Sequence, residues 1–353
     1  MAGIRVLVVD DSALARDLIK AILSTDRDIR VIGEAVNGLD AIETSARLKP
    51  DIVTMDIEMP VMDGLRAIEE IMASNAVPIL VVTTRGDAHM AYAAITKGAL
   101  DLVEKPDVNV EGAAEFISKI KLLSKIKVIT HMKGKQRPGV KQPELPIFNP
   151  TCGNGDELVA IASSSGGPEA LSIVLSGLPE KLPCPVVIAQ HMSDGFITGM
   201  VEWLRKTTLL NVKVGADGDA LEAGTVYVSP SEKHMQIRRG RRISLTDRRA
   251  KDIYRPSCDK LLASAADVYG SRTIGIILTG MGSDGVLGIK SIKEAGGATI
   301  AQDQKTSVVF GMPRAAIEGG YVDSILPIEE ISAGIVVLLG GYTSKEIKRR
   351  SLT

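Results

Sequence analysis

Short apolar runs alternate with longer amphipathic stretches along the first third of the chain. The apolar runs have strand length, and they span residues 4–9, 29–35, 52–55, 78–82 and 101–104. The stretches between them place apolar side chains at helical spacing, and they span residues 13–23, 39–48, 65–73, 88–97 and 111–127. Five strand–helix units in succession predict a doubly wound parallel sheet of the α/β class.

A second series of strand-length apolar runs begins at residue 157. It includes residues 157–162, 185–189, 273–278 and 298–301. Residues 224–229 and 234–244 differ, because they look like an antiparallel insertion that turns at Gly240. The second half is therefore predicted to be another doubly wound, Rossmann-like α/β domain with a small antiparallel insertion.

Between the two series lies a basic stretch that runs into a region rich in turn-forming residues. Every charged residue from 119 to 141 is Lys or Arg, and Pro, Gly and Asn are frequent from 134 to 155. This composition is typical of a helix end followed by a flexible, solvated linker. We therefore predict a first domain over residues 1–127, a linker over 128–156 and a second domain over 157–345.

Composition narrows the classes of partner. The 353 residues are 45% hydrophobic and 24% charged, with a formal net charge of −1 and only 3% aromatics. A nucleic-acid binder would usually show a basic face and, for single strands, stacking rings. We therefore expect no nucleic-acid partner, and the length suits two domains that each bury a core.

Cysteine usage and hydropathy bear on location. The three cysteines, Cys152, Cys184 and Cys258, are far apart and lack metal-ligand spacing, which favours buried or incidental thiols in a reducing compartment. No apolar run approaches the roughly 18 residues of a membrane span. The chain also reaches Asp10 and Asp11 before a signal-peptide cleavage pattern could develop. We expect a cytoplasmic monomer with no direct membrane insertion.

Polar side chains follow four strands of the first predicted sheet. Asp10 and Asp11 follow the first strand, Asp56 the third, Thr83 the fourth and Lys105 the fifth. These side chains should share the carboxyl edge of the sheet, where open α/β sheets place their sites. A single acid after a strand often only caps the next helix. Four strand ends with compatible chemistry favour a site.

The acids at this edge need a compensating charge. Three crowded carboxylates repel one another, and Mg²⁺ held by carboxylates and a phosphate oxygen fits that need. Carboxylates can act as phosphoryl acceptors. Lys105 could then pair with an anion on Asp56, and the Thr83 hydroxyl could hydrogen-bond to it.

The segment up to about residue 125 resembles response-regulator receiver domains, which are flavodoxin-like. The likeness rests on the double acid, on Met55-Asp-Ile-Glu-Met-Pro-Val-Met-Asp-Gly64, and on the later Thr and Lys-Pro. It implies that Asp56 is the phospho-acceptor and that Asp10, Asp11 and Asp56 bind Mg²⁺.

In the same resemblance, Thr83 and Lys105 are the residues that respond to phosphorylation. Receivers often carry a switch aromatic three residues before the lysine, but this chain has Leu102 there. Signalling through an aromatic gate is therefore not expected to follow the usual pattern.

The second half places Ser, His and Asp after three strands. The serines lie in Ile161-Ala-Ser-Ser-Ser-Gly-Gly-Pro168, His191 ends another apolar run, and Asp284 lies in Leu278-Thr-Gly-Met-Gly-Ser-Asp-Gly285. A Ser-His-Asp relay needs a base beside the serine, an acid that orients the base, and backbone N–H donors for the oxyanion. A serine–glycine turn before a helix is also typical of a cap or an anion-binding loop.

Spacing leaves the base and the acid open. Of the four histidines, His234 on the insertion is the alternative base. Asp303 also follows a strand and Asp194 lies close to His191, so spacing prefers Asp284 only weakly.

Residues 157–340 resemble the catalytic domain of chemotaxis protein-glutamate methylesterases. The shared motifs are Ser163-Ser-Ser-Gly-Gly-Pro168, Gln190-His-Met-Ser193, Leu278 to Gly285, Arg255-Pro-Ser257 and Gly311-Met-Pro-Arg314. By position, the resemblance makes Ser164 the nucleophile, His191 the base and Asp284 its orienting acid.

This chain departs from the family pattern at three places. Ser163 stands for Ala, Ser165 for Thr, and Ser193 for a Pro after the base. None of these changes removes a member of the expected triad, although Ser193 is expected to loosen the loop after His191.

Together the two resemblances imply a phosphorylation-activated serine hydrolase. Its substrates would be glutamate γ-methyl esters, and glutamines for deamidation, on methyl-accepting chemotaxis receptors. A chemotaxis histidine kinase would be the phosphodonor. The esterase step would need no cofactor, and Mg²⁺ would belong to the receiver. The rival hypotheses are a response regulator whose second domain binds a nucleotide or anion at residues 163–167 without catalysis, and a transcriptional regulator, which the charge disfavours.

Overall fold

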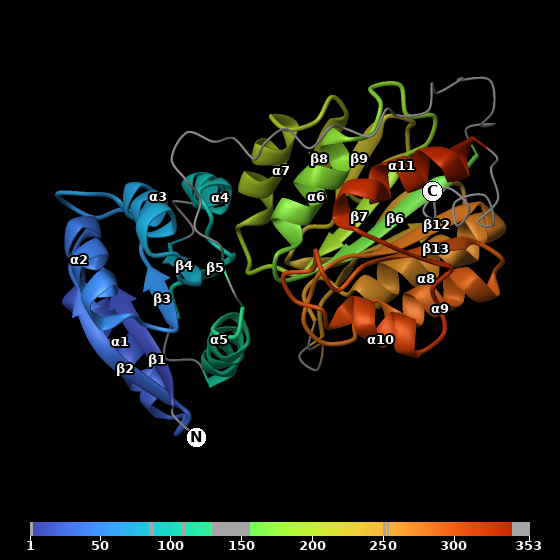
Figure 1. Ribbon diagram of the computed structural model, residues 1–353. Coiled ribbons are helices and arrows are strands. Elements are labelled where there is room, and N and C mark those ends of the chain that lie inside the picture. The colour runs from blue at the N-terminus through green and yellow to red at the C-terminus, as the bar shows by residue number, and fades with distance from the viewer. Residues whose placement is uncertain are drawn as a thin grey trace. The chain divides into compact units, whose positions relative to one another are not determined.

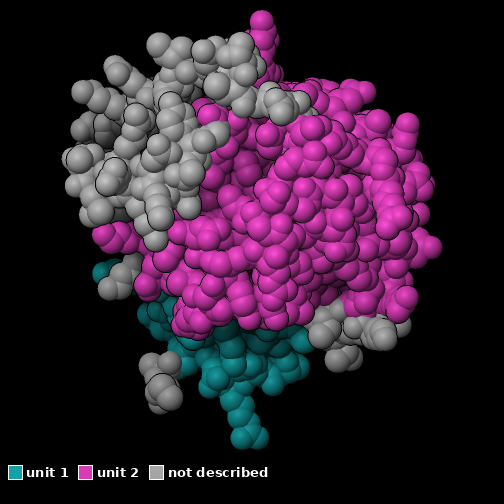
Figure 2. Space-filling model, turned by 90° about the vertical axis from the view of Figure 1, so that its right-hand side faces the viewer, with its two compact units in different colours: residues 1–138 teal, residues 139–353 magenta. Residues whose placement is uncertain are grey.

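The computed structural model describes residues 3–84, 88–106, 110–126, 128, 156–249, 252 and 254–340. The chain divides into two compact units, residues 1–138 and 139–353, shown in teal and magenta in Figure 2. The predicted linker falls almost entirely outside the described residues, so the predicted domain boundaries stay a prediction. His131 and Cys152 also lie outside them.

The first unit is a five-stranded parallel sheet in the order β2-β1-β3-β4-β5, with helices on both faces (Figure 1). Its strands are β1 Ile4–Val9, β2 Ile29–Ala35, β3 Ile52–Met55, β4 Ile79–Thr83 and β5 Asp101–Glu104. Its helices are α1 Ala13–Ser24, α2 Gly38–Leu48, α3 Gly64–Ser74, α4 Ala88–Thr96 and α5 Val110–Leu123. This is the flavodoxin-like strand order.

Capping side chains start the helices soon after the strands end. The Ser12 hydroxyl accepts a hydrogen bond from the Ala15 N–H at the start of α1. The Asn37 and Asp63 side chains do the same for α2 and α3. Each cap satisfies a backbone donor that the helix leaves free. The strand-to-helix turns are thereby fixed at the edge that carries the acids.

The second unit is a seven-stranded parallel sheet in the order β14-β13-β12-β6-β7-β9-β8. Its strands are β6 Leu158–Ser163, β7 Val186–Gln190, β8 Asn211–Val214, β9 Thr225–Val228, β12 Thr273–Ile277, β13 Ala298–Gln302 and β14 Ser324–Leu326. A separate antiparallel pair is formed by β10 Lys233–Arg238 and β11 Arg242–Asp247.

Helices cover both faces of this larger sheet (Figure 1). They are α6 Gly167–Ser176, α7 Ile197–Arg205, α8 Cys258–Tyr269, α9 Val286–Glu294, α10 Met312–Glu318 and α11 Ile328–Leu339. The α8 and α9 helices pack against each other and against central strands, around a buried cluster that includes Ala160, Leu261 and Ile289. Two α/β units with parallel sheets and a small antiparallel pair confirm the predicted fold class.

One part of the predicted insertion is wrong. Residues 225–228 form β9, which pairs in parallel with β7 and β8 in the main sheet. All four residues of β9 are buried, as is typical of a parallel strand covered on both faces. The pair that turns at Gly240 is antiparallel as predicted, and Gly240 has a φ of 82°. The short strands β8 and β14 were not predicted, and α5 ends at Leu123.

In each sheet, the strand order reverses between two neighbouring strands inside the sheet. In the first unit the reversal lies between β1 and β3, and in the second it lies between β6 and β12. Open α/β sheets bind ligands just outside the carboxyl ends of the strands at such points. Asp10 and Asp56 follow the first pair of strands, and Ser164 and Asp284 follow the second.

Candidate functional site

The acidic residues of the first unit converge on Lys105. The Lys105 Nζ lies 2.8 Å from Asp10 Oδ2 and 2.8 Å from Asp56 Oδ2. Asp10 and Asp56 are buried, whereas Asp11 is exposed. One carboxylate oxygen from each of the three acids lies within 4.8 Å of the others. The structure therefore brings together the three predicted metal ligands and the predicted lysine.

Burial dominates the electrostatics of this pocket. Desolvation raises the pKa of Asp56 to about 6, although the hydrogen bond from Lys105 acts in the opposite direction. Burial alone would lower the pKa of Lys105, but hydrogen bonds to Asp10 and Asp56 outweigh it and raise that pKa. Lys105 is therefore held as a cation beside the carboxylate that would carry a phosphoryl group.

The pocket has groups that can bind a cation and an anion. Lys105 pairs with two of the three clustered carboxylates, so a hard divalent cation with oxygen ligands suits the remaining negative charge. The Thr83 Oγ1 is buried and has no hydrogen-bond partner among the described residues. Such a hydroxyl normally finds a partner, and a phosphoryl oxygen on the pocket would supply one.

We expect Asp56→Asn to stabilise the first unit of the metal-free protein by about 2 kcal/mol at pH 7. Folding raises the pKa of the Asp56 carboxyl from 3.8 to about 6. The stability that this group contributes is fully present below pH 3.8 and is lost as the pH rises through 6. The check is amide hydrogen exchange in β1 and β3, in the presence of a chelator. Asp63→Asn is the control, because Asn caps α3 as well as Asp does. Equal protection of Asp56→Asn and the wild type at pH 7 would contradict this prediction.

Backbone and amide contacts hold the second candidate site together. The β6 and β7 strands are in register, with Ser163 opposite Gln190, and the His191 N–H donates to the Ser163 carbonyl at 3.0 Å. The Ser163 hydroxyl donates to Gln190 Oε1 at 2.6 Å. The Gln190 Nε2 donates to the carbonyls of Ser164 and His191, at 2.8 Å each. Gln190 therefore connects the serine loop to the histidine loop. The Ser163 hydroxyl has a structural role in this connection, because it donates to the Gln190 side chain.

His191 and Asp284 form a close pair. His191 Nε2 lies 2.8 Å from Asp284 Oδ2. The same carboxylate accepts from the backbone N–H groups of Cys258 at 2.6 Å and Asp259 at 3.0 Å, and from the Ser257 hydroxyl at 3.2 Å. Asp284 thus lies at the N-terminus of α8, where free N–H groups and the helix dipole favour a negative charge.

These contacts decide the charge of Asp284. Burial alone would raise its pKa, but the hydrogen bond and charge of His191 and the α8 N–H groups lower it below the usual range. Burial raises the pKa of the neighbouring Asp259, whose Oδ1 accepts from the N–H groups of Gly285 and Gly288 at the start of α9. Asp284 is therefore an ionised acceptor for the imidazole, and Asp259 ties α8 to α9.

Ser164 lies in the turn between β6 and α6. Its N–H donates to the Thr279 carbonyl at 3.0 Å, which joins it to the loop that carries Asp284. A Cβ built on Gly280 would lie only 2.7 Å from the Ser164 Cβ. Only glycine allows the two loops to approach this closely. The three predicted residues, Ser164, His191 and Asp284, thus follow neighbouring strands at the reversal of strand order.

The alternative residues have other partners. Both ring nitrogens of the buried His234 are used: Nε2 lies 2.8 Å from Asp252, and Nδ1 accepts from the Ser257 N–H. Asp194 forms two 2.8 Å hydrogen bonds with Arg248. Asp303 accepts from the Thr306 N–H and hydroxyl, as in a turn. Each of the three has a structural role.

Sequence reasoning gave no role to three residues at this site. Gln190 links the loops, Tyr254 stacks on His191, and Cys258 places its Sγ 3.4 Å from His191 Nε2. Burial raises the pKa of the Cys258 thiol well above its usual value, so Cys258 is a neutral packing group rather than a second nucleophile. The adjacency of Gln190 to His191 and the Tyr254–Ser257 run were the available signals.

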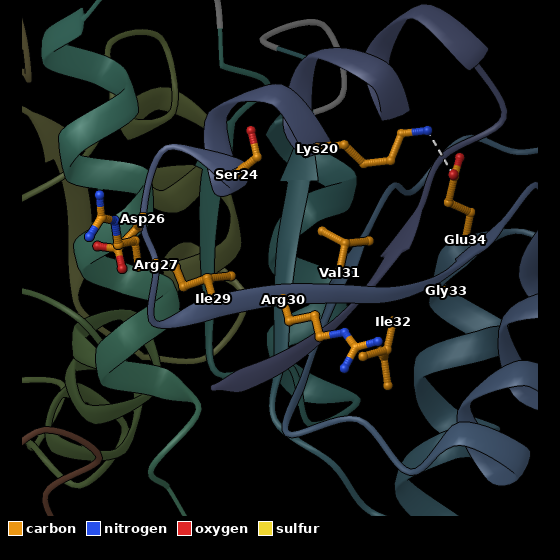
Figure 3. Close-up of a pocket in the computed structure, with 10 residues that line it drawn as sticks. All are labelled: Lys20, Ser24, Asp26, Arg27, Ile29, Arg30, Val31, Ile32, Gly33 and Glu34. Carbon is orange, nitrogen blue, oxygen red and sulfur yellow. Dashed lines mark hydrogen bonds and ion pairs between the residues drawn. The ribbon is translucent and has the colours of Figure 1, made fainter. Parts of the chain in front are cut away.

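A surface hollow in the first unit is a different feature. It is lined by α1 and β2, and Figure 3 shows Lys20 and Glu34 paired across part of it. Its lining residues include none of the predicted site residues.

In the described residues, no helix is long and apolar enough to cross a membrane.

Comparisons with known proteins match two separate parts of the chain to two families. The response regulator receiver domain profile matches residues 6–119, and the CheB methylesterase profile matches residues 159–335. The protein-glutamate methylesterase/protein-glutamine glutaminase 3 of Paramagnetospirillum magneticum is 47% identical over 342 residues, covering 96% of each chain. A relative from Thermotoga maritima that carries the same name without the number is 37% identical, covering 95% of this chain and 98% of its own.

Among solved structures, the Thermotoga maritima CheB methylesterase catalytic domain aligns with a TM-score of 0.50 and 39% identity. The alignment covers 52% of this chain and 98% of that domain. The fold and these matches define a hydrolase joined to a response-regulator receiver. The chain belongs to the CheB methylesterase family, with a receiver domain followed by a methylesterase domain.

Proposed function

We propose that this protein hydrolyses glutamate γ-methyl esters, and deamidates glutamines, on chemoreceptors through Ser164, His191 and Asp284. The observation that carries the proposal is the His191–Asp284 pair, placed beside a serine turn at the reversal of strand order. The relatives named above carry both activities in their names. Methylated receptor helices are the corresponding substrate, and a chemotaxis histidine kinase is the corresponding phosphodonor.

The orientation of the imidazole assigns its two nitrogens. Because ionised Asp284 only accepts hydrogen bonds, His191 Nε2 carries the proton that faces it. In the neutral imidazole, Nδ1 then holds the lone pair and acts as the base for Ser164. As Ser164 Oγ attacks the ester carbonyl, its proton passes to Nδ1, and that proton then leaves with methanol. Water attacks the acyl-enzyme by the same route, which returns the Ser164 hydroxyl and releases the receptor with a free γ-carboxylate on that glutamate side chain.

The receiver half of the proposal concerns regulation. Asp56 would accept a phosphoryl group, and Lys105 and Thr83 would contact its oxygens. Asp10, Asp11 and Asp56 would hold Mg²⁺, which when bound would neutralise negative charge at this site. Three observations support this assignment: the lysine that bridges Asp10 and Asp56, the Thr83 hydroxyl, which has no partner among the described residues, and the receiver match. Leu102 is buried, and no aromatic switch is proposed at that position.

The direct test is methanol release from a methylated receptor, measured with the wild type and with Ser164→Ala. Loss of release in the variant supports the proposed nucleophile. Retained release would show that another residue attacks the ester, and that the proposed triad is wrong.

We expect Asp284→Asn to lower turnover by about a hundredfold or more while the protein stays folded. With the asparagine oxygen in the place of Oδ1, it can still accept from the Asp259 N–H and the Ser257 hydroxyl, but the NH₂ group in the place of Oδ2 would face His191 Nε2 and the Cys258 N–H. This favours the tautomer that carries its proton on Nδ1, which removes the lone pair that Ser164 needs.

Steady-state methanol release with circular dichroism is the measurement for Asp284→Asn, and Asp303→Asn is the matched control. A larger loss of turnover in the Asp303 variant would transfer the orienting role to that residue.

A further inference from the structure

The imidazole of His191 is covered on one face by a tyrosine. The ring centroids of His191 and Tyr254 are 5.1 Å apart, and the planes are inclined by only 11°. This is the stacked geometry that aromatic rings prefer. The His191 side chain is 13% exposed, and Tyr254 is partly buried. The hydrogen bond to Asp284 fixes one ring nitrogen, and the stack restricts rotation of the whole ring.

Tyr254 belongs to a short segment that touches both proposed partners of the serine. The Arg255 carbonyl accepts from the Met192 N–H at 3.1 Å, next to His191. The Ser257 hydroxyl and the Cys258 N–H donate to Asp284. One segment therefore holds the base through Tyr254 and the acid through its helix start.

A second contact lies at the hydroxyl end of the tyrosine. A Cβ built on Gly282 would lie 3.0 Å from the Tyr254 Oη, so the loop that carries Asp284 passes against the phenol. The tyrosine therefore contacts both the imidazole and the loop that carries the acid.

We propose that Tyr254 is a positioning residue for the base, an inference that rests on the proposed triad. Its ring keeps the imidazole in the plane that directs Nε2 to Asp284 and Nδ1 to Ser164. It also lays the electron-rich face of the phenol against the imidazolium that forms when the serine proton is transferred, a favourable cation–π contact. Tyr254 itself transfers no proton.

The test separates the stack from the hydroxyl. Tyr254→Phe keeps the ring and should retain kcat within about threefold, whereas Tyr254→Leu should lower kcat by about tenfold or more. KM for the methylated receptor should stay within about twofold in both, because the ring acts on the base rather than on the substrate. Tyr321→Leu is the control: Tyr321 is another partly buried tyrosine of this unit, and its ring faces Lys290.

A second readout reports the imidazole directly. The chain has four histidines, so the imidazole signals in an NMR spectrum are few, and His191→Gln assigns those of His191. In the wild type and Tyr254→Phe, the His191 carbon-bound protons should show a ring-current shift, with a slowly exchanging Nε2 proton. In Tyr254→Leu the ring-current shift should vanish and the Nε2 proton should exchange faster with water. Thermal unfolding shows whether each variant is folded.

Different experimental results would overturn the proposed function and the positioning role of Tyr254. Full methanol release by Ser164→Ala would overturn the proposed function. An inactive Ser164→Ala together with a fully active Tyr254→Leu, or with unchanged His191 resonances in Tyr254→Leu, would overturn the positioning role alone. A loss that lies wholly in KM would also overturn it, because Tyr254 would then contact the substrate.

Discussion

Ser164→Ala is expected to lower methylesterase activity at least about a thousandfold. An alanine leaves no oxygen to form the acyl-enzyme, so only substrate binding and oxyanion stabilisation remain. The backbone contacts of Ser164, to Thr279 and from Gln190, do not involve its hydroxyl, so the variant should fold normally. Methanol release and thermal unfolding, measured on the same preparations, separate lost chemistry from lost structure.

The neighbouring serines provide the controls. Ser163→Ala removes the donor to Gln190 Oε1 and leaves that buried oxygen unpaired, which should cost stability of about 1–3 kcal/mol. Its turnover should fall far less than that of Ser164→Ala. Ser165→Ala should also stay active. An inactive Ser165→Ala with an active Ser164→Ala would show that the nucleophile lies one position later in the turn.

The strands that carry the site could be predicted closely from the sequence. The predicted runs 4–9 and 52–55 coincide with β1 and β3, because parallel strands covered by helices read as continuous apolar segments. The capping side chains Ser12 and Asp63 then place the helix starts. The edge position of Asp10 and Asp56 follows from these two strands, and that of Lys105 follows from the predicted run 101–104, which coincides with β5.

The contacts between distant segments could not be predicted in this way. His191 and Asp284 are 93 positions apart, and spacing preferred Asp284 to Asp303 only weakly. The two acids differ in their partners. The N–H groups at the start of α8 donate to Asp284, whereas Asp303 accepts from Thr306 in a local turn. Helix–loop contacts of this kind depend on the packing of the whole sheet. The placement of β9 was missed for the same reason.

The second large effect is expected at Asp56. Asp56→Asn should take up no labelled phosphate from a phosphorylated histidine kinase, because an amide cannot replace the buried carboxylate as acceptor. The full-length variant should keep the low activity of the unphosphorylated protein and should not respond to the phosphodonor. Asp63→Asn is the control, because Asp63 caps α3 and pairs with Arg66 and is not one of the three clustered acids. Labelling of Asp56→Asn at the wild-type level would place the acceptor elsewhere.

Phosphate labelling is a better probe than intrinsic fluorescence, because the only tryptophan, Trp203, lies in the other unit. A tenfold activation requires about 1.4 kcal/mol of differential stabilisation between an inhibited and an active arrangement. New contacts among an aspartyl phosphate, Mg²⁺, Lys105 and Thr83 are of sufficient strength.

If the unphosphorylated receiver inhibits by covering the active site, removing residues 1–150 should raise the basal activity. The second unit has its own sheet and buried core, so this truncation leaves that core intact. A truncated protein no more active than the unphosphorylated whole would exclude simple occlusion. The receiver would then have to activate the hydrolase by direct contact, and an interface variant that loses activity only when phosphorylated would identify that contact.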